Sequence, residues 1–240
     1  MFVEHNFSIG LSNINPLMEL TNTSLLKYLE DIASMHSEMV GFGMTDMKKT
    51  RKSWVLLAWK VEVKKRPLIN DTLTIKTWSR KIDKFYAYRD FEVKNQYEEI
   101  VAIITSKWIF IDIDKERLVK VTDDVIKSYK QEDISVFNNE DFEKIQEPEK
   151  ELNKMEFKVT RSMIDINKHL HNTYYLDIAK EALPEEIAFS NELNNFEVMY
   201  KKEIKLGETV KAIYSKQNDY HYITIKSKDE KTLHAIIKLK

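Results

Sequence analysis

Residues 23–40, TSLLKYLEDIASMHSEMV, carry apolar side chains at the spacing of an α-helix. Leu25, Leu29, Ile32, His36 and Met39 fall near this spacing, and His36 is expected to face solvent or to be satisfied by neighbouring groups. Gly41 follows, and glycine often ends a helix because it adopts the left-handed backbone conformation without strain. From about residue 54 to residue 121 the pattern changes to alternating, β-branched segments separated by turn residues, which is typical of antiparallel strands. A helix followed by such strands predicts an α+β fold.

The same order of elements returns later in the chain. A strand is predicted at 155–160 and a helix at about 172–183, which Pro184 ends. The strands predicted after this helix span 196–204, 209–215, 220–227 and 233–239. The two helices therefore each precede a series of strands, as a duplicated unit would require.

Short motifs support the duplication because they match in the same order. Asn22, at the start of the first helix, stands 150 positions before Asn172, and Thr72 stands 137 positions before Thr209. We expect an N-terminal domain at 1–130, an acidic and polar connecting segment at 131–152, and a C-terminal domain at 153–240.

Composition excludes several classes of protein. The 240 residues include 38 basic and 39 acidic side chains, so nucleic acid is not an expected partner. There is no Cys, which rules out disulfides, thiolate metal sites and cysteine nucleophiles. Glycine-rich phosphate loops are absent, and we expect no cofactor. With no signal peptide and no apolar run approaching the roughly 18 residues of a membrane span, a cytoplasmic protein is expected.

The stretch 162–175, SMIDINKHLHNTYY, places a carboxylate, an amide and an imidazole just before the second helix. In an extended segment Asp165, Asn167 and His169 would share one side, with Ile164 and Ile166 directed to the core. The imidazole can move a proton near neutral pH, the carboxylate can fix its tautomer, and free amides of the helix N-terminus suit a developing oxyanion. The alternative is a polar turn in which Asn172 caps the helix.

The spacing Asp-x-Asn-x-His-x-x-Asn over 165–172 resembles that of the acyl-acyl carrier protein (ACP) thioesterases, the plant-type fatty acyl-ACP hydrolases and their bacterial relatives. Further stretches agree with this family at 88–91, 106–108 and 117–123, and Tyr200-Lys201-Lys202-Glu203 is similar to its Tyr-Arg-Arg-Glu. The resemblance covers nearly the whole chain. It implies a tandem hotdog fold, in which each half is a long helix wrapped by an antiparallel sheet.

The resemblance also implies a set of site residues: Asp165, Asn167, His169 and Glu203 as catalytic groups, and no metal. Without it, Glu203 would be read as a surface charge. Plant members carry a Cys directly after this Glu, whereas this chain has Ile204. A thiol cannot attack here, and hydrolysis by water activated by Glu203 or His169 is expected. His169 and His171 alone do not make a metal site, and His171 is expected to cap or lie on the surface.

The function implied is hydrolysis of fatty acyl-ACP to free fatty acid and holo-ACP. The same chemistry on acyl-CoA and a non-catalytic acyl-thioester-binding module are the alternatives. Because ACP is strongly acidic, the basic runs 48–52 and 64–66 are candidate docking segments, or simply solvated faces. A monomer and a homodimer both remain open.

The first half lacks the catalytic set. Aligning the halves places Asn15, Leu17 and Glu19 opposite Asp165, Asn167 and His169, and Arg66 opposite Glu203. We therefore expect the second half to carry the chemistry and the first half to shape the acyl pocket.

Overall fold

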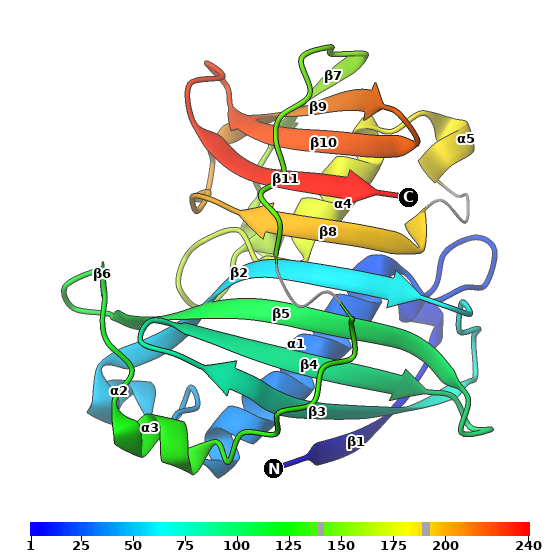
Figure 1. Cartoon of the computed structure of the whole chain (residues 1–240). Coiled ribbons are helices and arrows are strands. Elements are labelled where there is room, and N and C mark those ends of the chain that lie inside the picture. Colours follow the sequence, from blue (N-terminus) through cyan, green and yellow to red (C-terminus); the bar gives the residue numbers. More distant parts are fainter. Residues whose placement is uncertain (139–141, 189–192) are drawn as a thin grey trace. The chain divides into compact units, whose positions relative to one another are not determined.

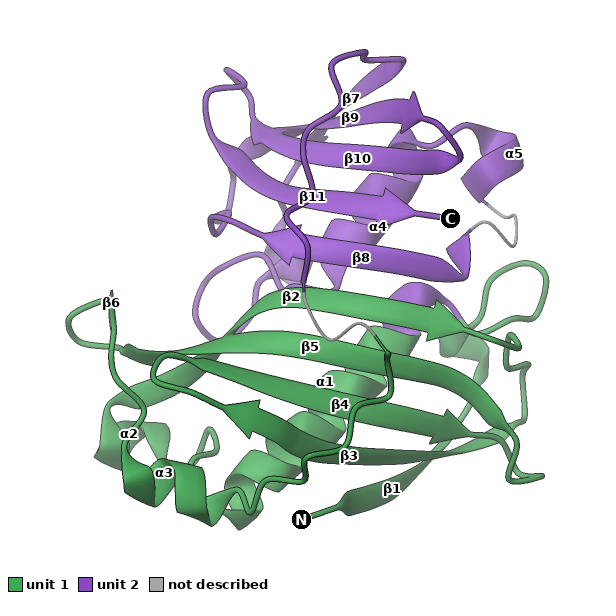
Figure 2. Ribbon diagram, viewed as in Figure 1, with its two compact units in different colours: residues 1–20, 25–141 green, residues 21–24, 142–240 purple. Residues whose placement is uncertain are grey.

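The computed structural model describes residues 1–138, 142–188 and 193–240. These residues form two compact units (Figure 2), one of residues 1–20 and 25–141 and the other of residues 21–24 and 142–240. No helix of the described residues is both long and apolar enough to cross a membrane.

Unit 1 is an antiparallel sheet with a long helix against one face (Figure 1). The helix is α1 (Asn22–Met39), close to the predicted 23–40. The strands, in the order in which they pair, are β1 (Val3–Ser8), β3 (Thr72–Ile82), β4 (Tyr86–Lys94), β5 (Ile100–Asp112) and β2 (Lys52–Val63). The short elements are a 3₁₀ turn (Leu11–Asn13), α2 (Met47–Thr50), β6 (Arg117–Leu118) beside β5, and α3 (Asp123–Ser128).

The core of unit 1 lies between α1 and the sheet. The predicted helix face is buried at Leu25, Leu29, Ile32 and His36, whereas Met39 at the helix end is exposed. Burial of this apolar stripe stabilises α1 on the sheet, because each fully buried Leu or Ile contributes about 2 kcal/mol. Gly41, with φ of +79°, follows the helix in the left-handed conformation that its position predicts.

Unit 2 has the same construction. The helix α4 (Tyr174–Ala182) packs against β7, β9, β10 and β11 and ends just before Pro184. The strands, in pairing order, are β8 (Asn195–Tyr200), β11 (Leu233–Leu239), β10 (Tyr220–Ser227), β9 (Thr209–Gln217) and β7 (Asn153–Lys158). A 3₁₀ turn (Arg161–Met163) precedes α4, and α5 (Glu185–Ala188) follows it.

The two units confirm the α+β prediction of a tandem hotdog, a helix on an antiparallel sheet twice in one chain. Residues 1–20 and 151–170 have the same series of strand, 3₁₀ turn and isolated bridges, 150 positions apart. The strand β1 was not predicted, although the 150-residue offset from the predicted strand at 155–160 pointed to it. Between α3 and β7 the described residues carry no helix or strand, and 131–152 remains our proposed connecting segment.

One predicted strand is too long. The segment predicted at 196–204 leaves the sheet after Tyr200, because the amides of Lys201 and Lys202 both donate to the carbonyl of His234, at 2.8 and 3.3 Å. Two donors on one carbonyl end the regular ladder of hydrogen bonds. Glu203 therefore lies on irregular backbone and not on a strand.

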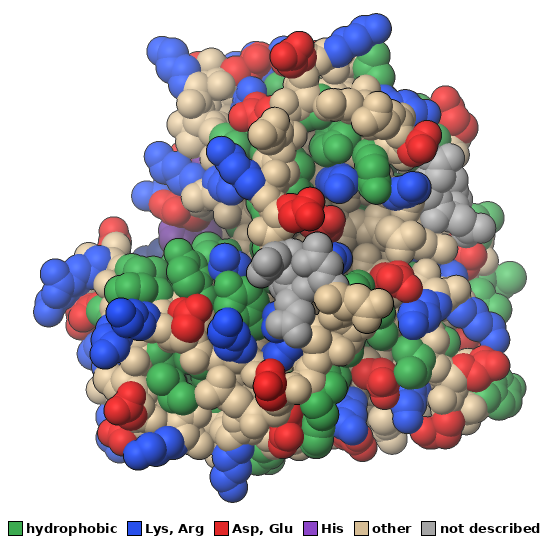
Figure 3. Space-filling model, in the orientation of Figure 1, with side chains coloured by type: hydrophobic (Ala, Val, Ile, Leu, Met, Phe, Trp, Pro, Cys, Tyr) green, Lys and Arg blue, Asp and Glu red, His purple; other side chains and the backbone are tan. Residues whose placement is uncertain are grey.

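Charges of both signs are interleaved on the face of the molecule drawn in Figure 3. This mixture agrees with the near balance of 38 basic and 39 acidic residues in the sequence. It gives that face no single-sign field of the kind that attracts a polyanion.

Candidate active site

Residues 165–169 form a closed turn held by one carboxylate. Oδ1 of Asp165 accepts hydrogen bonds from the backbone amides of Asn167 and His169, at 2.9 and 3.0 Å. The Asp165 amide donates to the carbonyl of His169 at 2.8 Å, and Lys168 adopts a φ of +65°. A short acidic side chain that bonds to backbone amides two and four residues on is the usual way in which Asp stabilises a turn.

The turn corrects the expectation of an extended segment. Ile166, expected in the core, is 66% exposed because the backbone curls back on itself and does not pair with a strand. Asp165 is occupied by backbone amides and by the side-chain amide of Asn167 at 3.4 Å. Its hydrogen bonds are thus those of the turn, and among the residues that the structure describes it makes none to the His169 ring.

The turn is joined to the segment that contains Glu203. The amide of Leu170 donates to the carbonyl of Ile204 at 2.7 Å, and the backbones of His169 and Lys205 form an antiparallel bridge. These bonds bring together two segments more than 30 positions apart in the chain. Of the four predicted site residues, Asp165 and His169 are partly buried, while Asn167 and Glu203 are exposed.

Tyr175, in the first turn of α4, lies beneath this junction. Burial raises the pKa of its hydroxyl, and the negative charges of Glu203 and Asp165 raise it further, while a backbone hydrogen bond from Ile204 opposes the rise. Both carboxylates therefore act on the same hydroxyl, which is neutral at physiological pH. The helical pattern at 172–183 gives no sign that the hydroxyl of Tyr175 contacts the site.

The His169 ring and the Glu203 carboxylate are the groups of this site that can transfer a proton. In the described part of the chain, neither the His169 ring nor the Glu203 carboxylate makes a hydrogen bond or ion pair. Groups that are free of protein contacts but held on anchored backbone can bind and activate a water molecule. Asn167 lies on the same turn as His169, and its side-chain amide, which donates one hydrogen bond to Asp165 at 3.4 Å, has a second N–H to offer.

The N-terminus of α4 does not supply the free amides that we expected for an oxyanion. Tyr174, Tyr175 and Leu176 already donate to the carbonyls of residues 171, 172 and 173, at 3.0, 3.3 and 3.2 Å. The amide of Thr173 donates to Nδ1 of His171 at 3.4 Å, a bond within the turn before α4, and no side-chain bond caps α4 at Thr173. The first amides of a helix normally lack a partner within the helix, but here they donate to carbonyls of the tight turn that precedes α4.

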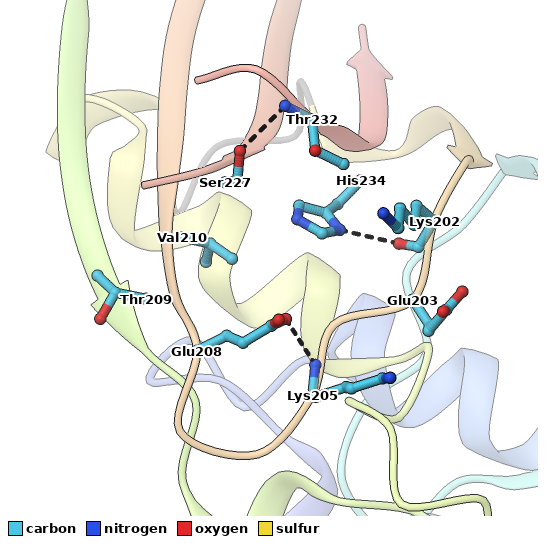
Figure 4. Close-up of a pocket in the computed structure, with 9 residues that line it drawn as sticks. All are labelled: Lys202, Glu203, Lys205, Glu208, Thr209, Val210, Ser227, Thr232 and His234. Carbon is cyan, nitrogen blue, oxygen red and sulfur yellow. Dashed lines mark hydrogen bonds between the residues drawn. The ribbon is translucent and has the colours of Figure 1, made fainter. Parts of the chain in front are cut away.

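A cavity of about 280 Å³ opens beside Glu203 (Figure 4). Its walls come from the segment between β8 and β9, from the start of β9 and from the β10–β11 connection, and include Glu208 and His234. Sequence reasoning missed His234, since the matched motifs did not extend to its strand. The described residues contain no group of three or more His, Cys, Asp or Glu that could hold a metal ion.

Fold and site together define a tandem hotdog protein whose second unit carries an imidazole and a carboxylate that make no hydrogen bond to the described residues. The family models "Acyl-ACP thioesterase N-terminal domain" and "Acyl-ACP thioesterase C-terminal domain" match residues 2–129 and 146–239. The chain belongs to the acyl-ACP thioesterase family, as the sequence motifs predicted.

Similar proteins include plant enzymes and a bacterial structure. The chain is 26% identical to the oleoyl-acyl carrier protein thioesterase of Coriandrum sativum over 91% of its length, and 28% identical to oleoyl-acyl carrier protein thioesterase 1 of Arabidopsis thaliana over 88%. It spans about 62% of the length of each of these relatives. The crystal structure of an acyl-ACP thioesterase from Bacteroides thetaiotaomicron superposes with a TM-score of 0.88 at 18% identity, covering 99% of this chain and 96% of that one.

Proposed function

We propose that this protein hydrolyses the thioester of a fatty acyl chain carried on ACP, releasing free fatty acid and holo-ACP and so ending chain growth. The family membership supports a thioesterase. The observation that carries the proposal is the junction at Leu170 and Ile204, which holds His169 and Glu203 on joined segments, with neither side chain hydrogen-bonded to a described residue. A pure binding module has no need of two free proton-transfer groups on one anchored junction.

In the proposed reaction a water molecule gives up a proton to Glu203 or His169 and adds to the carbonyl carbon of the thioester. The carbon–sulfur bond then breaks, and the thiol of the carrier leaves with a proton returned by the site. Asn167 donates from its side-chain amide to the carbonyl oxygen, and Asp165 holds the turn on which Asn167 and His169 lie. Ile204, which is apolar and fully buried, offers no nucleophile for a covalent intermediate.

The carrier is proposed to be ACP, with acyl-CoA as the second candidate. Some of the basic residues named for docking already have partners. Arg51 pairs with Asp114, Lys65 with Glu99 at 2.8 Å, and Arg66 donates to the carbonyl of Leu20 at 3.1 Å. Lys48, Lys49, Lys52 and Lys64 make no ion pair among the described residues and are the remaining candidates for contact with an acidic carrier.

The proposal is tested by release of free thiol from acyl-ACPs with chains of 8 to 18 carbons, with the matching acyl-CoAs in parallel. Turnover on acyl-ACP with much slower turnover on acyl-CoA is the expected result. Faster turnover on acyl-CoA would show that CoA is the carrier and would leave the proposed thioester hydrolysis in place. Binding of acyl-ACP without any turnover would overturn the hydrolase and leave an acyl-binding module.

A further inference from the structure

Hydrogen bonds fix the backbone carbonyl on each side of Glu203. The carbonyl of Ile204 accepts from the amide of Leu170 at 2.7 Å. The carbonyl of Lys202 lies 3.1 Å from Nδ1 of His234, and because a carbonyl only accepts, Nδ1 of His234 carries the proton. His234, in β11, is 5% exposed, so its ring is held by the packing of unit 2.

His234 binds the segment before Glu203 with three hydrogen bonds. Its carbonyl accepts the amides of Lys201 and Lys202, and its ring donates to the carbonyl of Lys202. Figure 4 shows the ring reaching to Lys202, with Glu203 next along the chain and both His234 and Glu203 at the wall of the same cavity. The ring therefore acts on the peptide group that directly precedes the Glu203 side chain.

The first half of the chain shows which of these bonds belong to the fold alone. There the amides of Lys64 and Lys65 donate to the carbonyl of Val101, at 2.8 and 3.2 Å, as those of Lys201 and Lys202 do to His234. Valine has no side-chain donor, and the residue that follows Lys65 is Arg66. The two backbone bonds thus occur in both halves, whereas the imidazole bond occurs in the half that has Glu203.

We propose that His234 is a positioning residue for Glu203, an inference that rests on the proposed role of Glu203 in hydrolysis. The Glu203 side chain is exposed and makes no hydrogen bond or ion pair to the described residues, so what the surrounding structure fixes is the backbone from which the carboxylate extends. Fixing the carbonyl of Lys202 removes the rotation of the preceding peptide that would turn the carboxylate away from the reacting carbon. A misplacement of about 1 Å at a reacting group costs on the order of 100-fold in rate.

Three variants of the 240-residue chain test this role, with kcat and KM measured on acyl-ACP and the melting temperature measured for each. His234→Val copies Val101 and is expected to lower kcat by about 10- to 100-fold while KM stays within about twofold, since substrate contacts are kept. His234→Asn restores a donor at the place of Nδ1 and is expected to recover most of kcat. Equal loss in the Val and Asn variants would contradict positioning through the Lys202 carbonyl.

The matched control is His221→Asn. His221 is also buried in unit 2, on the neighbouring strand β10, where its Nδ1 lies 2.8 Å from the hydroxyl of Tyr214 at the end of the strand away from Ser227. This variant is expected to lower the melting temperature and leave kcat of the folded protein unchanged. If His234→Val keeps wild-type kcat, or loses activity only as His221→Asn does, the inference fails. If the wild-type chain itself turns over no thioester, the proposed function fails instead.

Discussion

The turn at 15–19 and the turn at 165–169 have the same backbone bonds and different chemistry. In the first half, Oδ1 of Asn15 accepts from the amides of Leu17 and Glu19 at 2.9 and 3.0 Å, the distances that Asp165 makes with Asn167 and His169. The amide of Leu20 donates to the carbonyl of Pro67 at 2.8 Å, as Leu170 does to Ile204. The backbone frame is therefore a property of the repeated fold, and the chemistry is carried by the side chains placed on it.

In the first half, the side chains at the corresponding positions are hydrogen-bonded to other groups of the protein. The side-chain amide of Asn15 donates to Glu19 at 3.3 Å, and Arg66, which stands where Glu203 does, donates to the carbonyl of Leu20. Burial lowers the pKa of Arg66 to about 10, and the charge of Glu19 opposes that lowering. In the first half Glu19 and Arg66 thus have structural roles, whereas in the second half His169 and Glu203 make no side-chain hydrogen bond to the described residues.

The largest expected effect comes from removing the free groups. His169→Ala and Glu203→Gln should each lower kcat on acyl-ACP by at least about 100-fold, the usual size of a lost acid–base group. Glu19→Gln, at the position that matches His169, should leave kcat within about twofold. Steady-state kinetics on the three variants tests this, and near-wild-type turnover in both site variants would falsify the assignment.

Substitution of Asp165 separates its role in holding the backbone turn from its role in the reaction. Asp165→Asn copies Asn15, which shows that an amide oxygen holds this turn, so the melting temperature should barely change. We expect kcat to fall about 10-fold, because the negative charge that Asp165 contributes to the electrostatics of the site, and that reaches the Tyr175 hydroxyl, is lost. Asp165→Ala should additionally lower the free energy of unfolding by about 1–2 kcal/mol, through loss of the bonds to two amides. Equal kcat in wild type and Asp165→Asn would show that Asp165 only holds the backbone turn and takes no part in the reaction.

The buried His36 of unit 1 makes the stability of the protein depend on pH. His36 on α1 is fully buried, and Nη1 of Arg89 donates to its Nδ1 at 2.9 Å. Burial and the charge of Arg89 lower the pKa of His36 from 6.5 to about 3. Below pH 6.5 the unfolded chain therefore binds a proton that the folded chain does not, and stability decreases as the pH falls towards 3, by at most about 1.4 kcal/mol per pH unit.

His36→Asn keeps an acceptor for Arg89 but does not titrate, so its stability should fall less steeply than that of wild type between pH 6.5 and 4. Urea unfolding at a series of pH values gives both slopes. Parallel curves would show that His36 takes up no extra proton on unfolding.

The smallest effect is expected at the first-half turn. Asn15→Ala removes an oxygen that accepts two amide bonds on a partly exposed turn, which should cost about 1 kcal/mol of unfolding free energy. Because no free acid–base group lies on this turn, kcat of the folded protein should stay within about twofold. Denaturant melts and initial rates on the same preparation check both statements, and a 10-fold loss of kcat would give the first half a part in the reaction.

Local patterns in the sequence determined the fold class and the duplication. The spacing of Leu25, Leu29 and Ile32 identified α1 because a helix places such residues on one face, whatever the rest of the chain does. The offset of 150 residues holds from β1 through the turn at 15–19, because both halves use the same local bonds. The same offset would have found β1, had the alignment of the halves been extended to the N-terminus.

Only the tertiary structure decided how the site is assembled. Alternation predicted that Ile166 is buried and that Glu203 lies on a strand, and both predictions are wrong because bonds to Asp165 and to the carbonyl of His234 end the extended backbone. Which amide meets which carbonyl across more than 30 residues depends on register, and a period of two or 3.6 residues carries no information about register. The sequence motifs thus named Asp165, Asn167, His169 and Glu203. Only the structure shows that the two segments meet through Leu170 and Ile204, that the first amides of α4 are hydrogen-bonded, and that His234 contacts Lys202. These contacts follow from packing between segments that no local pattern connects.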